Sequence, residues 1–159
     1  MVKVTKGIKP EERRSIEEIL RSTDFFYEFE IQTALEISDE TITKGTEKSG
    51  YHWMKITDED GLVAFGNYGK NAFSTHSWDL YWIAVHQNSR NKKLGTILLK
   101  AIEDDIRNMG GKILWIETSG RPLYAPTEGF YKRNGYDLQA SLKEFYGTGD
   151  SKQIYSKTL

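Results

Sequence analysis

One stretch near the middle of the chain constrains its fold more than any other. The apolar run Tyr81–Val85 is followed by the polar and basic run His86–Thr96, and an apolar periodic pattern continues from Ile97. This order predicts a buried strand, a basic turn and the start of a helix. The first turn of a helix leaves backbone N–H groups without partners and carries a partial positive charge. An anion is therefore a natural ligand for this part of the chain.

The turn itself has the chemistry of a phosphate site. Arg90, Lys92 and Lys93 bring three cations to it, and Gly95 has no side chain to keep a ligand from the backbone. A pyrophosphate is the predicted ligand, and an ordinary solvated strand-to-helix connection is the alternative. The sequence contains neither G-x-x-x-x-G-K-[ST] nor G-x-G-x-x-G, so a P-loop nucleotidase or a Rossmann dehydrogenase is not favoured.

Composition narrows the classes further. The 159 residues carry a net charge of −1, 38% of them are apolar, and none is cysteine. We expect one globular domain over residues 1–159, without disulfides, a cysteine acyl-enzyme or bulk attraction to nucleic acid. The apolar runs are too short to cross a bilayer and no signal-peptide pattern is present, so a cytoplasmic location is expected. The scattered histidines lack metal-ligand spacing, and no metal is expected.

Periodicity and turn residues predict the order of elements as strand, helix, helix, three strands, helix, strand, helix and two strands. The expected strands are 2–5, 51–57, 62–68, 79–85, 112–117, 136–144 and 153–159. The second helix is expected from about Asp24 to Ser38, with Tyr27, Ile31, Ala34 and Leu35 facing inward. The third helix is expected to bury Leu94, Ile97, Leu98, Ile102 and Ile106, to expose Glu103 and to stop at Gly110. The fold class is α/β (α+β), with a mixed, mostly antiparallel sheet of about seven strands and about four helices.

A second motif, Gly129–Tyr136, reads Gly-Phe-Tyr-Lys-Arg-Asn-Gly-Tyr and is typical of a helix that ends at a left-handed glycine. With the basic turn and the order of elements, it makes the whole chain resemble the GNAT superfamily of acyl-CoA-dependent N-acyltransferases. The family's [Q/R]-x-x-G-x-[G/A] turn corresponds to Arg90–Gly95, where Lys93 replaces the middle glycine. Tyr124 replaces an asparagine that the family often has seven residues before the helix tyrosine, here Tyr131.

The resemblance implies a V-shaped splay between the fourth and fifth strands, into which the pantetheine arm of acetyl-CoA fits like an added strand. Val85 would direct its backbone N–H at the thioester carbonyl and stabilise the tetrahedral oxyanion. Acetyl-CoA is the implied co-substrate. Its implied contacts are Ile83, Ala84, Val85, Arg90, Asn91, Lys92, Lys93, Leu94, Gly95, Thr96, Tyr124 and Tyr131.

The implied reaction is direct transfer of an acetyl group to a primary amine of a small molecule or peptide in a ternary complex. An amine of pKa near 10 is mostly protonated at neutral pH and needs a base. Glu117 is the implied base and Asp79 the weaker competitor, although Glu117 could instead pair with a nearby cation. Tyr131 matches the family tyrosine that protonates the CoA thiolate, with an aromatic core position as the alternative.

The sequence gives fewer indications of which residues would bind the amine acceptor. Aromatic faces and carboxylates both attract cations, so part of the 25–30 segment could line an amine entrance, although helix packing is the commoner role of such a cluster. The candidate substrate residues are Phe26, Tyr27, Asp79, Tyr81, Glu117 and Tyr146. The expected partner is the amine acceptor, with no nucleic acid or membrane, and a homodimer is a further candidate assembly. The competing function is a catalytically weak acyl-CoA-binding regulatory module.

Overall fold

The computed structural model describes residues 1–159 and contains seven strands and five α-helices. The strands are β1 (Lys3–Lys6), β2 (His52–Asp58), β3 (Gly61–Lys70), β4 (Ser77–Val85), β5 (Ile113–Ser119), β6 (Asp137–Gly147) and β7 (Asp150–Thr158). The helices are α1 (Arg13–Ser22), α2 (Glu28–Lys44), α3 (Thr46–Ser49), α4 (Leu94–Asn108) and α5 (Ala125–Arg133). The predicted order of elements is confirmed, and the short α3 is an addition to it.

The strands are hydrogen-bonded in the order β1-β2-β3-β4-β5-β7-β6. The β4–β5 pair is parallel, whereas β1–β2, β2–β3, β5–β7 and β6–β7 are antiparallel. The expected mixed, mostly antiparallel sheet is therefore confirmed. The chain forms two compact units. The first unit contains Met1–Gly69 and Tyr81–Asp105, and the second contains Lys70–Leu80 and Ile106–Leu159.

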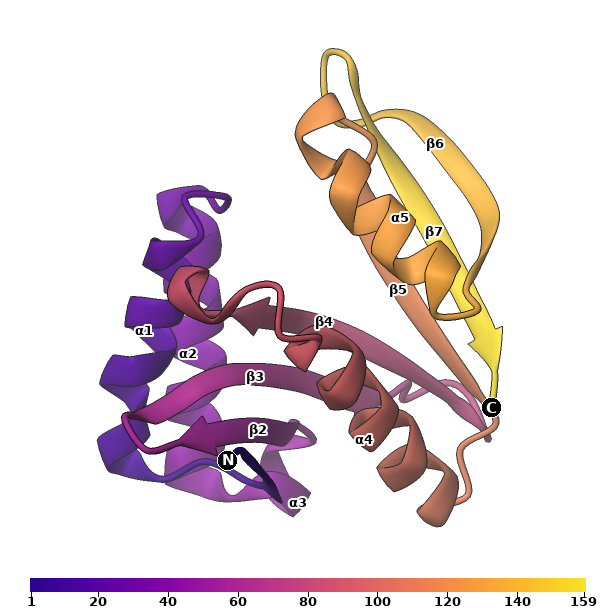
Figure 1. Ribbon diagram of the computed structural model, residues 1–159. Helices are drawn as coiled ribbons and strands as arrows, with labels where there is room; N and C mark the ends of the chain where they lie inside the picture. Colours follow the sequence, from indigo (N-terminus) through magenta and orange to yellow (C-terminus); the bar gives the residue numbers. More distant parts are fainter. The chain divides into compact units, whose positions relative to one another are not determined.

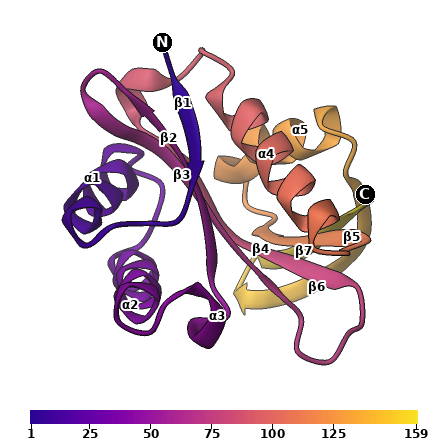
Figure 2. The same cartoon turned by 90° about the horizontal axis from the view of Figure 1, so that it is seen from below.

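In the first unit, α1 and α2 cover one face of β1–β3, and α4 lies on the other face (Figures 1 and 2). The layer beneath α1 and α2 is apolar because both helices turn a stripe of aliphatic side chains toward the sheet. Its buried members are Ile16, Ile19, Leu20, Ile31, Ala34, Leu35, Trp53, Phe65 and Ala84. The predicted inward positions in the middle of α2, Ile31, Ala34 and Leu35, are confirmed.

The predicted ends of α2 were wrong. Asp24 has a left-handed φ of 52°, so the helix cannot begin there, and it starts at Glu28. Tyr27 precedes the helix, is half exposed, and donates its backbone N–H to the Glu30 carboxylate at 2.9 Å. At the other end the helix continues six residues past Ser38 to Lys44. It can do so because the Thr41 hydroxyl donates to a carbonyl one turn back and accepts a hydrogen bond from the buried Trp53 indole at 2.9 Å.

Two positions of α4 also differ from the prediction. Ile97 is 40% exposed, whereas Glu103 is only 4% exposed. The buried row of the helix includes Leu99, and Glu103 lies four residues later on the same row. Ile97 falls on the flank of this stripe. The helix ends as predicted, because Gly110 takes a φ of 86°.

In the second unit, α5 lies along the sheet formed by β5, β7 and β6 (Figure 1). Tyr131 of α5 packs against Tyr155 of β7, with ring centroids 6.1 Å apart. Tyr155 is the register partner of Ile116, so these two side chains share the face that α5 covers. The predicted left-handed glycine at the end of α5 is confirmed, with Gly135 at φ 90°. The final hairpin is tighter than predicted, since Gly147 pairs directly with Asp150.

Candidate functional site

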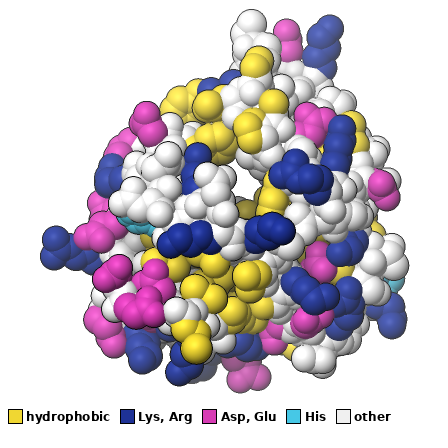
Figure 3. Space-filling view, in the orientation of Figure 1, with side chains coloured by type: hydrophobic (Ala, Val, Ile, Leu, Met, Phe, Trp, Pro, Cys, Tyr) yellow, Lys and Arg dark blue, Asp and Glu magenta, His cyan; other side chains and the backbone are white.

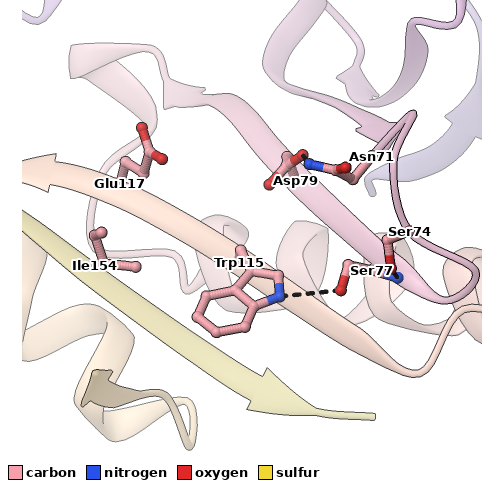
Figure 4. A pocket seen from close by; sticks show the side chains of 7 residues that line it. All are labelled: Asn71, Ser74, Ser77, Asp79, Trp115, Glu117 and Ile154. Carbon is pink, nitrogen blue, oxygen red and sulfur yellow. Dashed lines mark hydrogen bonds between the residues drawn. The ribbon is translucent and has the colours of Figure 1, made fainter. Parts of the chain in front are cut away.

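A cavity of about 360 Å³ opens on the second unit, on the face of its sheet that α5 does not cover (Figure 4). The lining residues are Asn71, Ser74, Ser77, Asp79, Trp115, Glu117 and Ile154. Asp79 of β4 is in register with Trp115 of β5, and side chains alternate along a strand. Two alternate residues of each parallel strand, Ser77 and Asp79 of β4 and Trp115 and Glu117 of β5, therefore line one cavity. Ile154 of β7 joins them as the register partner of Glu117.

The loop before β4 supplies the remaining polar wall. Asn71 donates its backbone N–H to the carbonyl of Ser77 at 2.9 Å, and the Ser74 hydroxyl accepts the backbone N–H of Ser77 at 2.9 Å. The loop is thus closed on itself by short bonds. The Asn71 side-chain amide then donates to Asp79 Oδ2 at 3.3 Å, which fixes the carboxylate toward the loop (Figure 4).

The surroundings of the Asp79 carboxylate make it more basic than an ordinary aspartate. Its carboxyl group is half buried, and this burial raises its pKa. The hydrogen bond from Asn71 opposes the shift, and the negative charge of Glu117 adds to it. The net result is a raised pKa, so the Asp79 carboxylate holds a proton more strongly than an aspartate in water.

Glu117 has a cationic partner. Lys152 of β7 places Nζ 2.9 Å from Glu117 Oε2, and 53% of the Glu117 side chain is exposed. The expectation that this residue could pair with a nearby cation is confirmed, and a role as base remains a prediction. On the cavity floor the Trp115 indole donates to the Ser77 hydroxyl at 3.3 Å (Figure 4).

Sequence reasoning named Asp79 and Glu117 but missed the rest of this cavity. A period-two reading of the two strands would have added Ser77 and Trp115, because they flank the two carboxylates at spacing two. No sequence pattern indicated Asn71 or Lys152. The position of Asn71 at the cavity depends on how its loop folds back, and the position of Lys152 depends on the register between β5 and β7.

Tyr131 does not line the cavity. It is buried on the face under α5, where its ring also contacts Phe130 and Tyr136 at centroid distances of 5.3 and 5.9 Å. The expected aromatic core position is confirmed, and the proton-donor role remains a prediction. Burial raises the pKa of its phenol, so the group keeps its proton at neutral pH.

Two other predicted tyrosines of this unit also lie outside the cavity lining. Tyr124 immediately precedes α5, and the Arg121 guanidinium lies over its ring at 5.3 Å. Tyr146 of β6 is about half exposed and contacts Phe145 edge-on at 5.1 Å. Neither tyrosine therefore lines the cavity together with Asp79 and Glu117.

The basic turn of the first unit has left-handed backbone at two of its residues. Asn91 and Lys93 adopt left-handed φ values of 67° and 59°. A glycine takes this conformation without strain, which explains why the family has glycine where Lys93 stands. Helix α4 begins at Leu94, and Ile97 donates its N–H to the Lys93 carbonyl at 3.1 Å. The N–H groups of residues 94–96 therefore precede the first helical hydrogen bond.

The cations of the turn are accessible. Arg90, Lys92 and Lys93 are all exposed, and Figure 3 shows Lys and Arg side chains over the segment that joins β4 to α4. Nearby on β4, Ala84 belongs to the apolar core, while Ile83 and Val85 are half buried.

The predicted aromatic substrate residues of this unit separate into two groups. Phe26 packs on the core and contacts Trp82 edge-on at 5.2 Å, which confirms helix packing for that residue. Tyr27 stacks on Phe29 at 5.5 Å and is exposed, so its predicted inward position was wrong. Tyr81 is partly exposed and contacts Tyr51 at 5.7 Å.

No group of three or more His, Asp or Glu side chains is arranged to hold a metal ion. None of the helices combines the length and apolar character needed to span a membrane.

Comparisons with known proteins agree with this architecture. The profile of the acetyltransferase (GNAT) family matches residues 14–136. A GNAT-family protein from Desulfovibrio desulfuricans is 36% identical, with a TM-score of 0.96 and 99% of each chain covered. An aminoglycoside 6'-N-acetyltransferase complexed with coenzyme A is 18% identical, with a TM-score of 0.77 over 99% of this chain and 96% of that one. The ribosomal-protein-S18-alanine N-acetyltransferase of Escherichia coli is 16% identical, with a TM-score of 0.75 over 99% and 94%. Among curated protein sequences, none matches this chain.

Proposed function

Because the chain belongs to the acetyltransferase (GNAT) family, we propose that it transfers the acetyl group of acetyl-CoA to a primary amine of a small molecule or peptide. The observation that carries the choice of acceptor is the cavity with two carboxylates, Asp79 and Glu117, beside the indole of Trp115. Carboxylates and an aromatic face together attract a protonated amine. The similar folds named above act on an aminoglycoside and on a protein alanine, both of which are amine acceptors.

We assign acetyl-CoA binding to the first unit. The exposed cations Arg90, Lys92 and Lys93, and the free N–H groups at the start of α4, suit the pyrophosphate. The family resemblance supports a pantetheine arm along Ile83–Val85, with the Val85 N–H as oxyanion donor. One similar fold is solved with coenzyme A, which supports this ligand class. Asn91, Leu94, Gly95, Thr96 and Tyr124 remain predicted contacts of the same ligand.

The proton acceptor in this proposal is Asp79. Its hydrogen-bond partner Asn71 is neutral, whereas Glu117 is ion-paired with Lys152 at 2.9 Å. The raised pKa of Asp79 favours proton uptake, and the amide of Asn71 leaves its negative charge in place. Glu117, held by Lys152, then lines the cavity beside the base. This assignment exchanges the ranking that the sequence alone suggested for the two residues.

The reaction proceeds by direct attack, and the chain has no cysteine to form an acyl-enzyme thioester. The ammonium gives one proton to Asp79, and the neutral nitrogen bonds to the thioester carbonyl carbon. The carbon–sulfur bond then breaks as the nitrogen releases its second proton to solvent water. The Tyr131 phenol protonates the departing thiolate and regains a proton from solvent.

The test is to follow free thiol from acetyl-CoA in the presence of a panel of alkylamines, aminoglycosides and peptides. Thiol release that requires an amine, with the acetylated amine found in equal amount, supports the proposal. Tight acetyl-CoA binding without amine-dependent release from any member of the panel would instead favour a catalytically weak acyl-CoA-binding module.

A further inference from the structure

Lys152 lies beside the cavity and holds one of its two carboxylates. Its Nζ is 2.9 Å from Glu117 Oε2 and 4.2 Å from the centroid of the Phe145 ring. Only 15% of the Lys152 side chain is exposed. A lysine between a carboxylate and an aromatic face, with its stem covered, is a fixed cation rather than a mobile surface charge.

The sheet explains how this cation is fixed. Lys152 pairs with Ser119, so it lies diagonally opposite Glu117, whose own partner is Ile154. Diagonal neighbours share a face of the sheet and are within reach of long side chains. Phe145 comes from an irregular part of β6, where the register with β7 shifts between Leu142 and Gly147. Glu144 adopts a left-handed φ of 54° in this irregular part, directly before Phe145.

The charges at the cavity leave one negative charge unmatched. Glu117 and Lys152 cancel, and the next pair along the same hairpin, Arg121 and Asp150, is also matched at 3.3 Å. The unmatched negative charge is that of Asp79, because its side-chain partner Asn71 is neutral.

Resting on the proposed amine acetylation, we propose that Lys152 determines acceptor specificity. By occupying the ammonium position beside Glu117, it limits the cavity to acceptors with a single positive charge, the one on the amine to be acetylated. A diamine would bring its second ammonium toward Lys152 and be repelled. Like charges a few ångströms apart in a partly desolvated site repel strongly enough to change an affinity by about tenfold or more.

The experiment compares pentylamine with diaminopentane, which differ by one ammonium group at equal chain length. Lys152→Met removes the charge and keeps an unbranched side chain against Phe145, and Lys152→Arg keeps the charge. Lys143→Met is the matched control, since Lys143 is an exposed cation on the neighbouring strand. For each variant, kcat/KM for acetylation is measured, and binding to the CoA complex is followed through the Trp115 indole N–H resonance. Thermal unfolding checks that each variant is folded.

Lys152→Met is expected to raise the preference for diaminopentane over pentylamine about tenfold. Lys152→Arg and Lys143→Met should keep the wild-type preference. Glu117→Gln gives a second test that leaves Lys152 in place, and it should lower the preference for the diamine. Equal changes for both amines in Lys152→Met, or no change, would overturn the proposal.

The two proposals can fail separately. If neither amine is acetylated but the Trp115 resonance reports the altered preference, Lys152 has the proposed effect and the proposed reaction is wrong. If both amines are acetylated and the preference is unchanged in Lys152→Met, the reaction stands and the role of Lys152 is overturned.

Discussion

Asp79 and Glu117 stand on adjacent parallel strands and point into the same cavity. Asp79 is in register with Trp115, and Glu117 follows two residues later on β5. Parallel strands place residues of one face in rows, so a carboxylate on each strand is enough to make an acidic cavity. The partners of the two groups differ, because a neutral amide holds Asp79 and an ammonium holds Glu117.

The pH dependence of acetylation follows from Asp79. As an acceptor of protons it must be ionised, so kcat/KM should rise with pH through its raised pKa. Glu117→Gln removes a negative neighbour and therefore lowers the pKa of Asp79. We expect the acid limb of the pH profile to move to lower pH in that variant. An acid limb at the wild-type position would show that another group controls it.

Asp79 should also reduce the stability of the fold at neutral pH. Its pKa is higher in the folded chain than in the unfolded chain, so the folded chain holds the proton more tightly. The free energy of unfolding therefore falls as pH rises from the ordinary aspartate pKa to the raised one. Below that interval the penalty is absent.

Asp79→Asn removes this titration. The variant should match the wild type in acid and exceed it at neutral pH, as measured by urea unfolding at a series of pH values. Asp137→Asn, at an exposed position, is the control and should show no such difference. A stability difference between wild type and Asp79→Asn that is constant with pH would contradict the raised pKa.

Tyr131→Phe should lower kcat by about 10²-fold, the usual effect of losing a positioned proton donor, and leave acetyl-CoA affinity unchanged. Tyr155→Phe is a matched control because Tyr155 is also buried and contacts the same ring, and its hydroxyl has no hydrogen-bond partner. Losing that hydroxyl should cost nothing in stability or activity. Equal kcat values for the two variants would remove Tyr131 from the chemistry.

Lys93→Gly should stabilise the protein. The left-handed φ of 59° costs a side chain about 1–2 kcal/mol, and the greater freedom of glycine when unfolded returns about 0.5–1 kcal/mol of this. We expect a net gain of about 0.5–1 kcal/mol in chemical denaturation. Lys92→Gly removes the same charge where φ is not left-handed and should bring no gain. If both variants lose stability equally, the strain at Lys93 is not relieved by glycine.

The order of strands and helices was predictable because it depends on local periodicity. Ile16, Ile19 and Leu20 form a stripe at helical spacing, and the glycines after α4 and α5 mark the ends of those helices. The limits of α2 were not predictable in this way. The start follows the left-handed φ of Asp24, and the end depends on Trp53, which is distant in sequence and gives Thr41 a buried partner.

The candidate site likewise had features that local sequence could predict and features that it could not. Asp79 and Glu117 were recognisable from their places at strand ends and from the family resemblance. The relation between them was not, because it requires the register of β4 with β5. The pairing of Glu117 with Lys152 depends on a second register, 35 residues further along the chain, and no local pattern reports it.

The most direct test of the account is the effect of amine basicity on the Asp79→Asn variant. Ethylamine reaches the enzyme protonated and needs a base, whereas trifluoroethylamine is largely neutral at neutral pH and does not. If Asp79 takes the proton, Asp79→Asn should lower kcat/KM about 10²-fold for ethylamine and have little effect with trifluoroethylamine. An equal loss with both amines would contradict the claim that Asp79 is the base.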